Sequence, residues 1–220
     1  MPTRLETINW ITDCGMAAVI RAKSSDHLMQ VAEAIKQGGI DVIEVTMTTP
    51  NALQVIEEVA EKYGDEVLIG VGTVLDAETC RMAILSGAEF VVGPCLDRDM
   101  IEMAHRYDKP ILPGAFTPSE IKQAWDWGAD MVKVFPADVG GPGYFKAVLG
   151  PLPQIRLVPT GGVDIDTTPA FLRAGAVALC AGGALVDSKA VAEGRFDVVT
   201  DTARRFREVI DETREEMAAD

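Results

Sequence analysis

The sequence predicts a closed α/β barrel, in which eight parallel strands and the helices between them form one domain over residues 1–220. Short apolar stretches rich in β-branched residues alternate with helical patterns at a spacing of about 20–25 residues. The stretches are apolar throughout, as strands are when helices cover both faces of a parallel sheet. A doubly wound open sheet is the rival fold. No Gly-x-Gly-x-x-Gly motif follows the first strand, so a TIM-type barrel is favoured.

Each element is predicted from the spacing of its apolar residues and from the residues that begin or end it. Leu5, Ile8 and Ile11 should pack a leading helix onto the barrel, and Ser24 or Ser25 should cap the first helix between strands. The expected strands are 16–21, 41–46, 67–71, 90–92, 111–113, 131–135, 156–158 and 177–180. The expected helices are about 1–15, 25–37, 51–63, 76–85, 97–107, 118–127, one beginning at 144, 167–173 and about 196–217.

Composition and charge exclude several classes of partner. The chain carries 20 basic and 34 acidic residues, for a net charge of −14, which argues against nucleic acid and anionic membranes because both call for basic patches. No apolar run reaches the roughly 18 residues of a membrane span. The N-terminus lacks the charged-then-apolar layout of a signal peptide, so we expect a cytoplasmic protein.

The cysteines and histidines predict neither a disulfide framework nor a metal site. The chain has four cysteines without a Cys-x-x-Cys pair, at positions 14, 80, 95 and 180. Its two histidines, His27 and His105, fall within helical patterns and are expected to be surface or capping residues. Metal-dependent lyases and hydrolases need clusters of histidine and carboxylate ligands, and none is found.

A lysine interrupts the apolar strand expected at 131–135. Because alternate side chains of a strand face opposite ways, Met131, Lys133 and Phe135 share one face and Val132 and Val134 share the other. An ammonium buried among apolar neighbours is costly and tends to lose its proton. A neutral lysine is a nucleophile that forms Schiff bases with carbonyl compounds. The alternative is a lysine at the strand end that reaches water.

A glutamate occupies the middle of the second expected strand. If Ile43 and Val45 face the helices, Glu44 faces the barrel interior, where a carboxylate is costly unless it is paired or used. Glu44 and Lys133 are therefore either a structural ion pair or an acid/base and a nucleophile. Because buried ion pairs stabilise poorly, the second interpretation is favoured.

Small residues gather where the expected strands end, which is the active-site face of such barrels. Gly161-Gly162 and Gly182-Gly183 follow the seventh and eighth strands, the two places where these barrels often hold a phosphate on backbone N–H groups. Arg21 closes the first strand and can reach a carboxylate or phosphate, with a plain surface cation as the alternative.

At these residues the sequence resembles the family of 2-keto-3-deoxy-6-phosphogluconate (KDPG) and 4-hydroxy-2-oxoglutarate (KHG) aldolases. The resemblance runs in order from about residue 16 to 186. The matching segments are Gly38-Gly39-Ile40, Ile43-Glu44-Val45-Thr46, Gly70-Val71-Gly72-Thr73-Val74-Leu75, Val132-Lys133-Val134-Phe135-Pro136-Ala137 and Pro159-Thr160-Gly161-Gly162-Val163.

The resemblance implies a role for each matching position. Lys133 would form the Schiff base and Glu44 would be the general acid/base that serves it. The residues implied in substrate binding are Thr73, Pro94 and Phe135 around pyruvate, and Arg21, Thr160, Gly161, Gly162, Gly182 and Gly183 around the distal phosphate or carboxylate. The family further implies a homotrimer, no metal or other cofactor, and a place in carbohydrate metabolism of the Entner–Doudoroff type.

The sequence departs from the family pattern at two positions. Many members carry an arginine shortly after the strand glutamate, where it can hold the pyruvate carboxylate. Here the segment is Met47-Thr48-Thr49-Pro50, which leaves the carboxylate to hydroxyls, backbone N–H groups or Arg21. The serine that many KDPG-type members place after the last glycines is Ala184 here. Both departures leave the exact substrate open.

Three functions follow from these observations. The first is a metal-free aldolase that releases pyruvate and an aldehyde, such as glyceraldehyde 3-phosphate or glyoxylate, from a 2-oxo-3-deoxy acid. The second is a phosphate-binding isomerase or epimerase that uses Glu44 as a base and needs no imine. The third is a barrel that binds sugar acids without catalysis. The presence of both Lys133 and Glu44 favours the aldolase.

Overall fold

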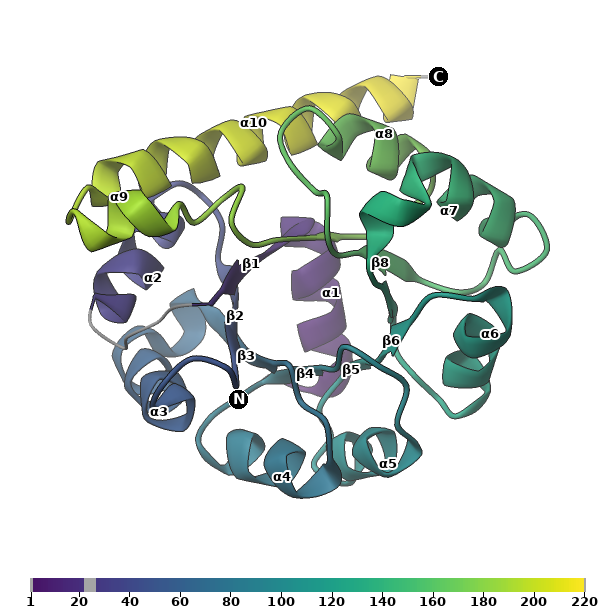
Figure 1. Ribbon diagram of the computed structural model, residues 1–220, viewed down its shortest axis with the longest axis horizontal. Coiled ribbons are helices and arrows are strands. Elements are labelled where there is room, and N and C mark those ends of the chain that lie inside the picture. Colours follow the sequence, from purple (N-terminus) through teal and green to yellow (C-terminus); the bar gives the residue numbers. More distant parts are fainter. Residues whose placement is uncertain (1, 22–26, 220) are drawn as a thin grey trace.

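The computed structural model describes residues 2–21 and 27–219 and shows a parallel barrel surrounded by helices (Figure 1). The strands are β1 (Met16–Ile20), β2 (Val42–Thr46), β3 (Leu68–Gly72), β4 (Phe90–Val92), β5 (Ile111–Leu112), β6 (Gly114–Ala115), β7 (Val132–Val134), β8 (Leu157–Pro159) and β9 (Leu179–Ala181). Every neighbouring pair is parallel. The predicted fold class is confirmed.

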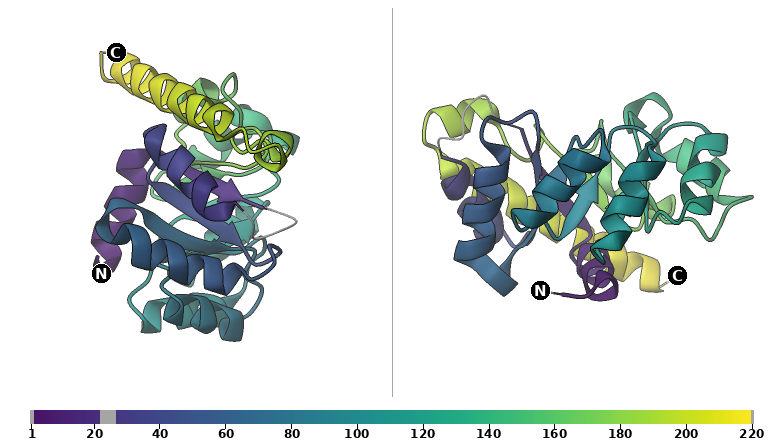
Figure 2. Two further views of the ribbon diagram at one scale, coloured as in Figure 1. Left: turned by 90° about the vertical axis from the view of Figure 1, so that its left-hand side faces the viewer. Right: turned by 90° about the horizontal axis from the view of Figure 1, so that it is seen from below.

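Helices follow the strands around the outside of the ring, except for the first one. The helices are α1 (Arg4–Cys14), α2 (Leu28–Gln37), α3 (Ala52–Tyr63), α4 (Ala77–Leu85), α5 (Arg98–Arg106), α6 (Pro118–Asp126), α7 (Gly141–Leu149), α8 (Thr168–Arg173), α9 (Ser188–Ala192) and α10 (Phe196–Ala219). Two 3-10 turns, η1 (Gly64–Glu66) and η2 (Ala137–Val139), complete the elements of the described residues. The long α10 runs across α2 and α8 (Figures 1 and 2).

The ring closes through two runs of paired strands. One run has the order β5-β4-β3-β2-β1-β9 and the other β6-β7-β8. At one seam the chain passes directly from β5 through Pro113 to β6. At the other seam Thr160, which follows β8, bridges Cys180 of β9. The fifth expected strand, 111–113, is observed as β5 and ends before Pro113, because proline has no N–H with which to continue the ladder. The strand β6 that follows Pro113 was not expected from the sequence.

Helix α1 lies across one end of the barrel, where Figure 1 shows it inside the ring of strands. Thr3 begins α1 with a capping box, in which its hydroxyl accepts from Glu6 N and its own N–H donates to the Glu6 carboxylate. Ile8 and Ile11 are buried as predicted, but Leu5 is 64 % exposed. The buried face of α1 is centred on residues 7, 8, 11 and 14, so the prediction for Leu5 was wrong.

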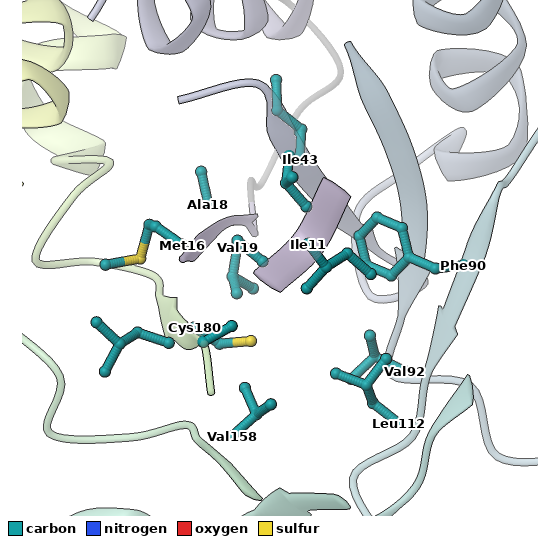
Figure 3. Packing of buried hydrophobic residues seen from close by; sticks show 14 of the residues in the cluster. Ile11, Met16, Ala18, Val19, Ile43, Phe90, Val92, Leu112, Val158 and Cys180 are labelled. Atoms are coloured by element: carbon teal, nitrogen blue, oxygen red, sulfur yellow. The ribbon is translucent and has the colours of Figure 1, made fainter. Parts of the chain in front are cut away.

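Apolar side chains fill much of the barrel interior around the two charged side chains of β2 and β7. Figure 3 shows Val19, Val92, Leu112, Val158 and Cys180 gathered toward one interior, with Ile43 set apart from them. Register explains this division, because residues paired across parallel strands share a face. Val19 pairs with Glu44, and Ala18 pairs with Ile43.

Some helices of the structure differ from those expected from the sequence. The expected N-caps Ser24 and Ser25 lie outside the described residues; α2 is described from Leu28, with exposed His27 before it making no side-chain cap. The short α9 was not expected from the sequence. Within the described ranges, no helix is both long enough and apolar enough to cross a bilayer.

Candidate active site

Lys133 occupies the middle of β7 and is almost completely buried. It is 6 % exposed, between Val132 and Val134 at 0 %. Its backbone N–H donates to Pro113 O at 3.0 Å, which fixes the strand beside the β5–β6 junction. The side chain turns toward the ring of Phe135, whose centroid lies 5.3 Å from Lys133 Nζ. The predicted buried lysine beside an aromatic ring is therefore present.

Glu44 is fully buried in β2 and its carboxyl group has no hydrogen-bond partner. It is 0 % exposed, and neither Oε1 nor Oε2 accepts or donates a bond among the described residues. The next strand makes room for it at Gly72, where a Cβ would lie 1.7 Å from Glu44 Oε1. Burial raises the pKa of Glu44, and the nearby charges of Lys133 and Arg21 oppose that rise without reversing it.

The relation between Glu44 and Lys133 is electrostatic rather than an ion pair. Lys133 favours the charged form of Glu44 through space, yet no hydrogen bond or salt bridge joins these two described residues. Polar atoms that are buried without a partner in a native fold call for an explanation, such as a water or a substrate between them. A carboxyl group held toward its neutral form, beside a primary amine, suits transfer of protons to and from groups bound at that amine.

Two further predicted residues lie at the ends of β3 and β4. Thr73 is half-buried directly after β3 and has a φ of 58°, a left-handed conformation that is costly for threonine. Pro94 follows β4 and packs on Gly114, where a Cβ would lie 2.2 Å from the Pro94 carbonyl carbon. Neither Thr73 nor Pro94 borders the cavity described next.

A cavity of about 570 Å³ opens at the carboxyl ends of β1, β7, β8 and β9. It brings together most of the residues predicted to bind the substrate, namely Arg21, Phe135, Thr160, Gly161, Gly162, Gly182 and Gly183. Gly161 and Gly162 both have positive φ, 92° and 68°, so their backbone turns in a way that a side chain would strain. We call this the distal cavity, because Lys133 and Glu44 are not among the residues that line it.

The distal cavity also contains residues that the sequence analysis missed. Cys180 lines it from β9; burial raises the pKa of the Cys180 thiol to about 12, with Glu44 adding to the rise and Lys133 opposing it. Asp164, Asp187 and Ser188 line it as well. Alternate side chains of the eighth expected strand face opposite ways, so the sequence could have placed Cys180 on the interior face of the barrel. The two aspartates, in contrast, look like ordinary turn or helix-cap residues in the sequence.

A second hollow of the described chain lies away from the predicted site residues. A hollow of about 670 Å³ lies outside the barrel among α2, the end of α3 and the start of α10, and none of the predicted site residues borders it. Among residues 2–21 and 27–219, no group of three histidine, cysteine or acidic residues is arranged to hold a metal ion.

Comparison with known proteins decides among the functions that the sequence left open. The model of the family "Aldolase: KDPG and KHG aldolase" matches residues 8–202. This chain belongs to that family. The 2-dehydro-3-deoxy-phosphogluconate aldolase of Haemophilus influenzae is 32 % identical over 210 residues, covering 95 % of this chain and 97 % of the relative. The KHG/KDPG aldolase of Escherichia coli is 34 % identical over 196 residues, covering 88 % and 91 %.

Solved structures agree with this assignment to the KDPG/KHG aldolases. A KDPG aldolase from Legionella pneumophila, captured with pyruvate as a covalent carbinolamine, superimposes with a TM-score of 0.84 at 28 % identity and covers 90 % of this chain and 96 % of its own. A protein cage designed by fusing symmetric oligomeric domains matches with a TM-score of 0.87 at 27 % identity, covering 93 % and 75 %. The chain is therefore an enzyme, a carbon–carbon lyase of the Schiff-base, class I type.

Proposed function

We propose that this aldolase cleaves a 4-hydroxy-2-oxo acid with an unsubstituted C3 into pyruvate and an aldehyde, by way of an imine on Lys133. The observation that carries the proposal is the buried pair of Lys133 and Glu44, in which the Glu44 carboxyl group has no hydrogen-bond partner among the described residues. The relatives are named for KDPG and KHG, and both acids have this arrangement of groups.

Each step uses one of these two side chains. The Lys133 amine adds to the C2 carbonyl, and loss of water from the carbinolamine gives a protonated imine. Glu44, directly or through a water, takes the C4 hydroxyl proton, and the electrons of the C3–C4 bond move into the imine as the aldehyde leaves. The resulting enamine takes a proton at C3, and water hydrolyses the imine to pyruvate and free Lys133. No step needs a metal ion.

The hydroxyls at the end of β2 are proposed to receive the carboxylate of the substrate. Thr46 Oγ1 lies 2.9 Å from Thr48 Oγ1, and Thr48 is exposed where many family members carry an arginine. Arg21 lines the distal cavity instead, which favours the hydroxyls over Arg21 for this role. Thr73 and Pro94, at the ends of the next two strands, complete the proposed pyruvate end.

Reduction of the imine tests this function directly. Borohydride added with pyruvate should leave a pyruvyl adduct on the peptide that contains Lys133, as detected by mass spectrometry. Lys133→Ala should lose the adduct and at least about 10⁴-fold of the rate of pyruvate release. Lys109 is a matched control, because it is also a buried lysine but is paired with Glu89. Its peptide should carry no adduct, and Lys109→Ala should keep the adduct on Lys133. Absence of an adduct on Lys133 in a folded protein, whether or not Lys109 reacts, would overturn the proposal.

We also propose that the chain forms a homotrimer, the state implied by its family. Leu75, Met82 and Leu85 support an interface along α4, because all three are large apolar side chains more than half exposed on or beside that helix. A mass measured by light scattering that corresponds to one chain would contradict it. A cytoplasmic location stays a prediction from the sequence.

A further inference from the structure

The charged side chains that line the distal cavity suit a ligand with hydroxyl groups better than one with a phosphate. Of the described residues that line it, Arg21 is the only cationic one, whereas Asp164 and Asp187 both carry carboxylates. A third carboxylate borders the glycine pair, since a Cβ on Gly161 would lie 3.4 Å from Asp138 Oδ1. The described lining is therefore net negative at neutral pH.

Each of these two aspartates accepts one backbone N–H at or just before the start of a helix beside the cavity. Asp164 Oδ1 accepts from Thr167 N at 2.7 Å ahead of α8, and Asp187 Oδ1 accepts from Ala190 N at 2.6 Å in α9. Among the described residues, no hydrogen bond uses the second oxygen of either carboxylate. Each aspartate thus keeps one carboxylate oxygen available as an acceptor.

Apart from Arg21, the remaining donors of the described lining are neutral. Gly161 and Gly162 can present backbone N–H groups, and Ser188 can present a hydroxyl. Position 184, where a side-chain hydroxyl would add a donor, is an alanine. Neutral donors beside unpaired carboxylate oxygens match a chain of hydroxyl groups, which donate and accept in turn.

We propose that the distal cavity selects an uncharged, hydroxylated tail, so that the enzyme prefers an unphosphorylated 2-oxo-3-deoxy sugar acid to the corresponding phosphate ester. This inference rests on the proposed function. A phosphate monoester carries between one and two negative charges near pH 7. At roughly 8 Å in a watery cavity, each carboxylate weakens binding of such an ester by about threefold to fivefold. Arg21 offsets only one of the carboxylates.

Amide substitutions separate the charge of these aspartates from their hydrogen bonds. Asparagine keeps a side-chain oxygen that can accept from Thr167 N or Ala190 N, so Asp164→Asn and Asp187→Asn keep these bonds and remove only the charge. The readout is kcat/KM for pyruvate release from 2-keto-3-deoxygluconate and from its 6-phosphate, at fixed ionic strength. Asp166→Asn is the matched control, because Asp166 is exposed in the same loop and does not line the cavity.

We expect the wild type to favour the unphosphorylated acid. Each variant should shift the ratio of kcat/KM values toward the 6-phosphate by about fivefold, and the double variant by about 20-fold, whereas Asp166→Asn leaves the ratio unchanged. Added salt should raise kcat/KM for the 6-phosphate alone, because it screens the repulsion. A wild-type preference for the 6-phosphate that neither variant alters would overturn the inference. Failure of both acids to give pyruvate in a Lys133-dependent way would instead overturn the proposed function.

Discussion

Two buried carboxyl groups in this barrel have opposite surroundings. Asp130, just before β7, accepts hydrogen bonds from Arg4 Nε at 2.7 Å and Ile111 N at 3.0 Å, and lies 3.3 Å from His105 Nε2. Glu44, in the middle of β2, has no partner for either oxygen among the described residues. Both residues are at most 5 % exposed, so the difference between them lies in their partners.

The partners decide which form each carboxyl group takes. Burial pushes the pKa of Asp130 up, but the hydrogen bonds from His105, Ile111 and Arg4 outweigh burial and leave the pKa lowered. Burial raises the pKa of Glu44, and two nearby cations do not cancel it. Asp130 is therefore an anion that joins α1 to the amino-terminal end of the barrel. Glu44 has a raised pKa and no partner among the described residues, which suits the proton-transfer role proposed for it.

The comparison predicts opposite effects of the same chemical change. Glu44→Gln should lower kcat for pyruvate release by about 10²- to 10⁴-fold, the range of a general acid/base. Near pH 4, where Glu44 is protonated in the folded protein, the same substitution should change the free energy of unfolding by less than about 1 kcal/mol. Asp130→Asn should keep kcat and lower the free energy of unfolding by about 2–4 kcal/mol, because it disrupts a buried charge with three partners. Steady-state kinetics and urea titration measure the two quantities. A loss of activity in Asp130→Asn with an unchanged free energy of unfolding would contradict the distinction between a structural Asp130 and a catalytic Glu44.

A pair of glycines on β3 sharpens the comparison within one strand. A Cβ on Gly72 would lie 1.7 Å from Glu44 Oε1, the movable end of a side chain, so Gly72→Ala should displace the carboxyl group and lower kcat by about tenfold or more. A Cβ on Gly70 would lie 2.4 Å from the Phe90 ring, which core packing holds in place. Gly70→Ala should therefore lower the free energy of unfolding by about 1–3 kcal/mol. Steady-state kinetics and denaturant titration of both variants measure these two effects. A larger loss of kcat in Gly70→Ala than in Gly72→Ala would contradict the prediction.

The sequence predicts the catalytic side of this comparison better than the structural side. A charged residue inside an apolar strand, as at Glu44 and Lys133, is a local signal because strand parity sets the direction of each side chain. The partners of Asp130 come from positions 4, 105 and 111, and nothing in the local pattern brings them together. His105 was expected at the surface or at a cap, and it instead lies beside this buried carboxylate.

The same reasoning explains the other differences. The glycine pairs at 161–162 and 182–183 were predicted to meet because parallel strands end at one face, and they do line one cavity. Asp164 and Asp187 were missed because their sequence context shows only turns and the start of a short helix. The end of β5 before Pro113 follows from the missing N–H of Pro113, but that a strand resumes at Gly114 depends on pairing with Lys133.

The dependence of stability on pH tests the opposite pKa shifts of the two carboxyl groups. In the unfolded chain, glutamate and aspartate titrate near about 4.3 and 3.9. The folded protein holds the Glu44 proton more tightly than the unfolded chain does. The contribution of Glu44 is therefore fully present below about pH 4.3 and is lost as pH rises through its raised pKa. The contribution of Asp130 is fully present above about pH 3.9 and is lost as pH falls through its lowered pKa.

Urea titrations across pH would separate these two contributions. The free energy of unfolding of wild type minus that of Glu44→Gln should fall with pH above about 4.3, by at most about 1.4 kcal/mol per unit. The same difference against Asp130→Asn should rise with pH at a similar limiting slope up to about pH 3.9 and then level off. Equal slopes of one sign for both variants would mean that burial governs both groups and that the partners of Asp130 do not lower its pKa. Slopes of opposite sign are expected, because burial without partners favours a bound proton, whereas hydrogen bonds to the anion favour its loss.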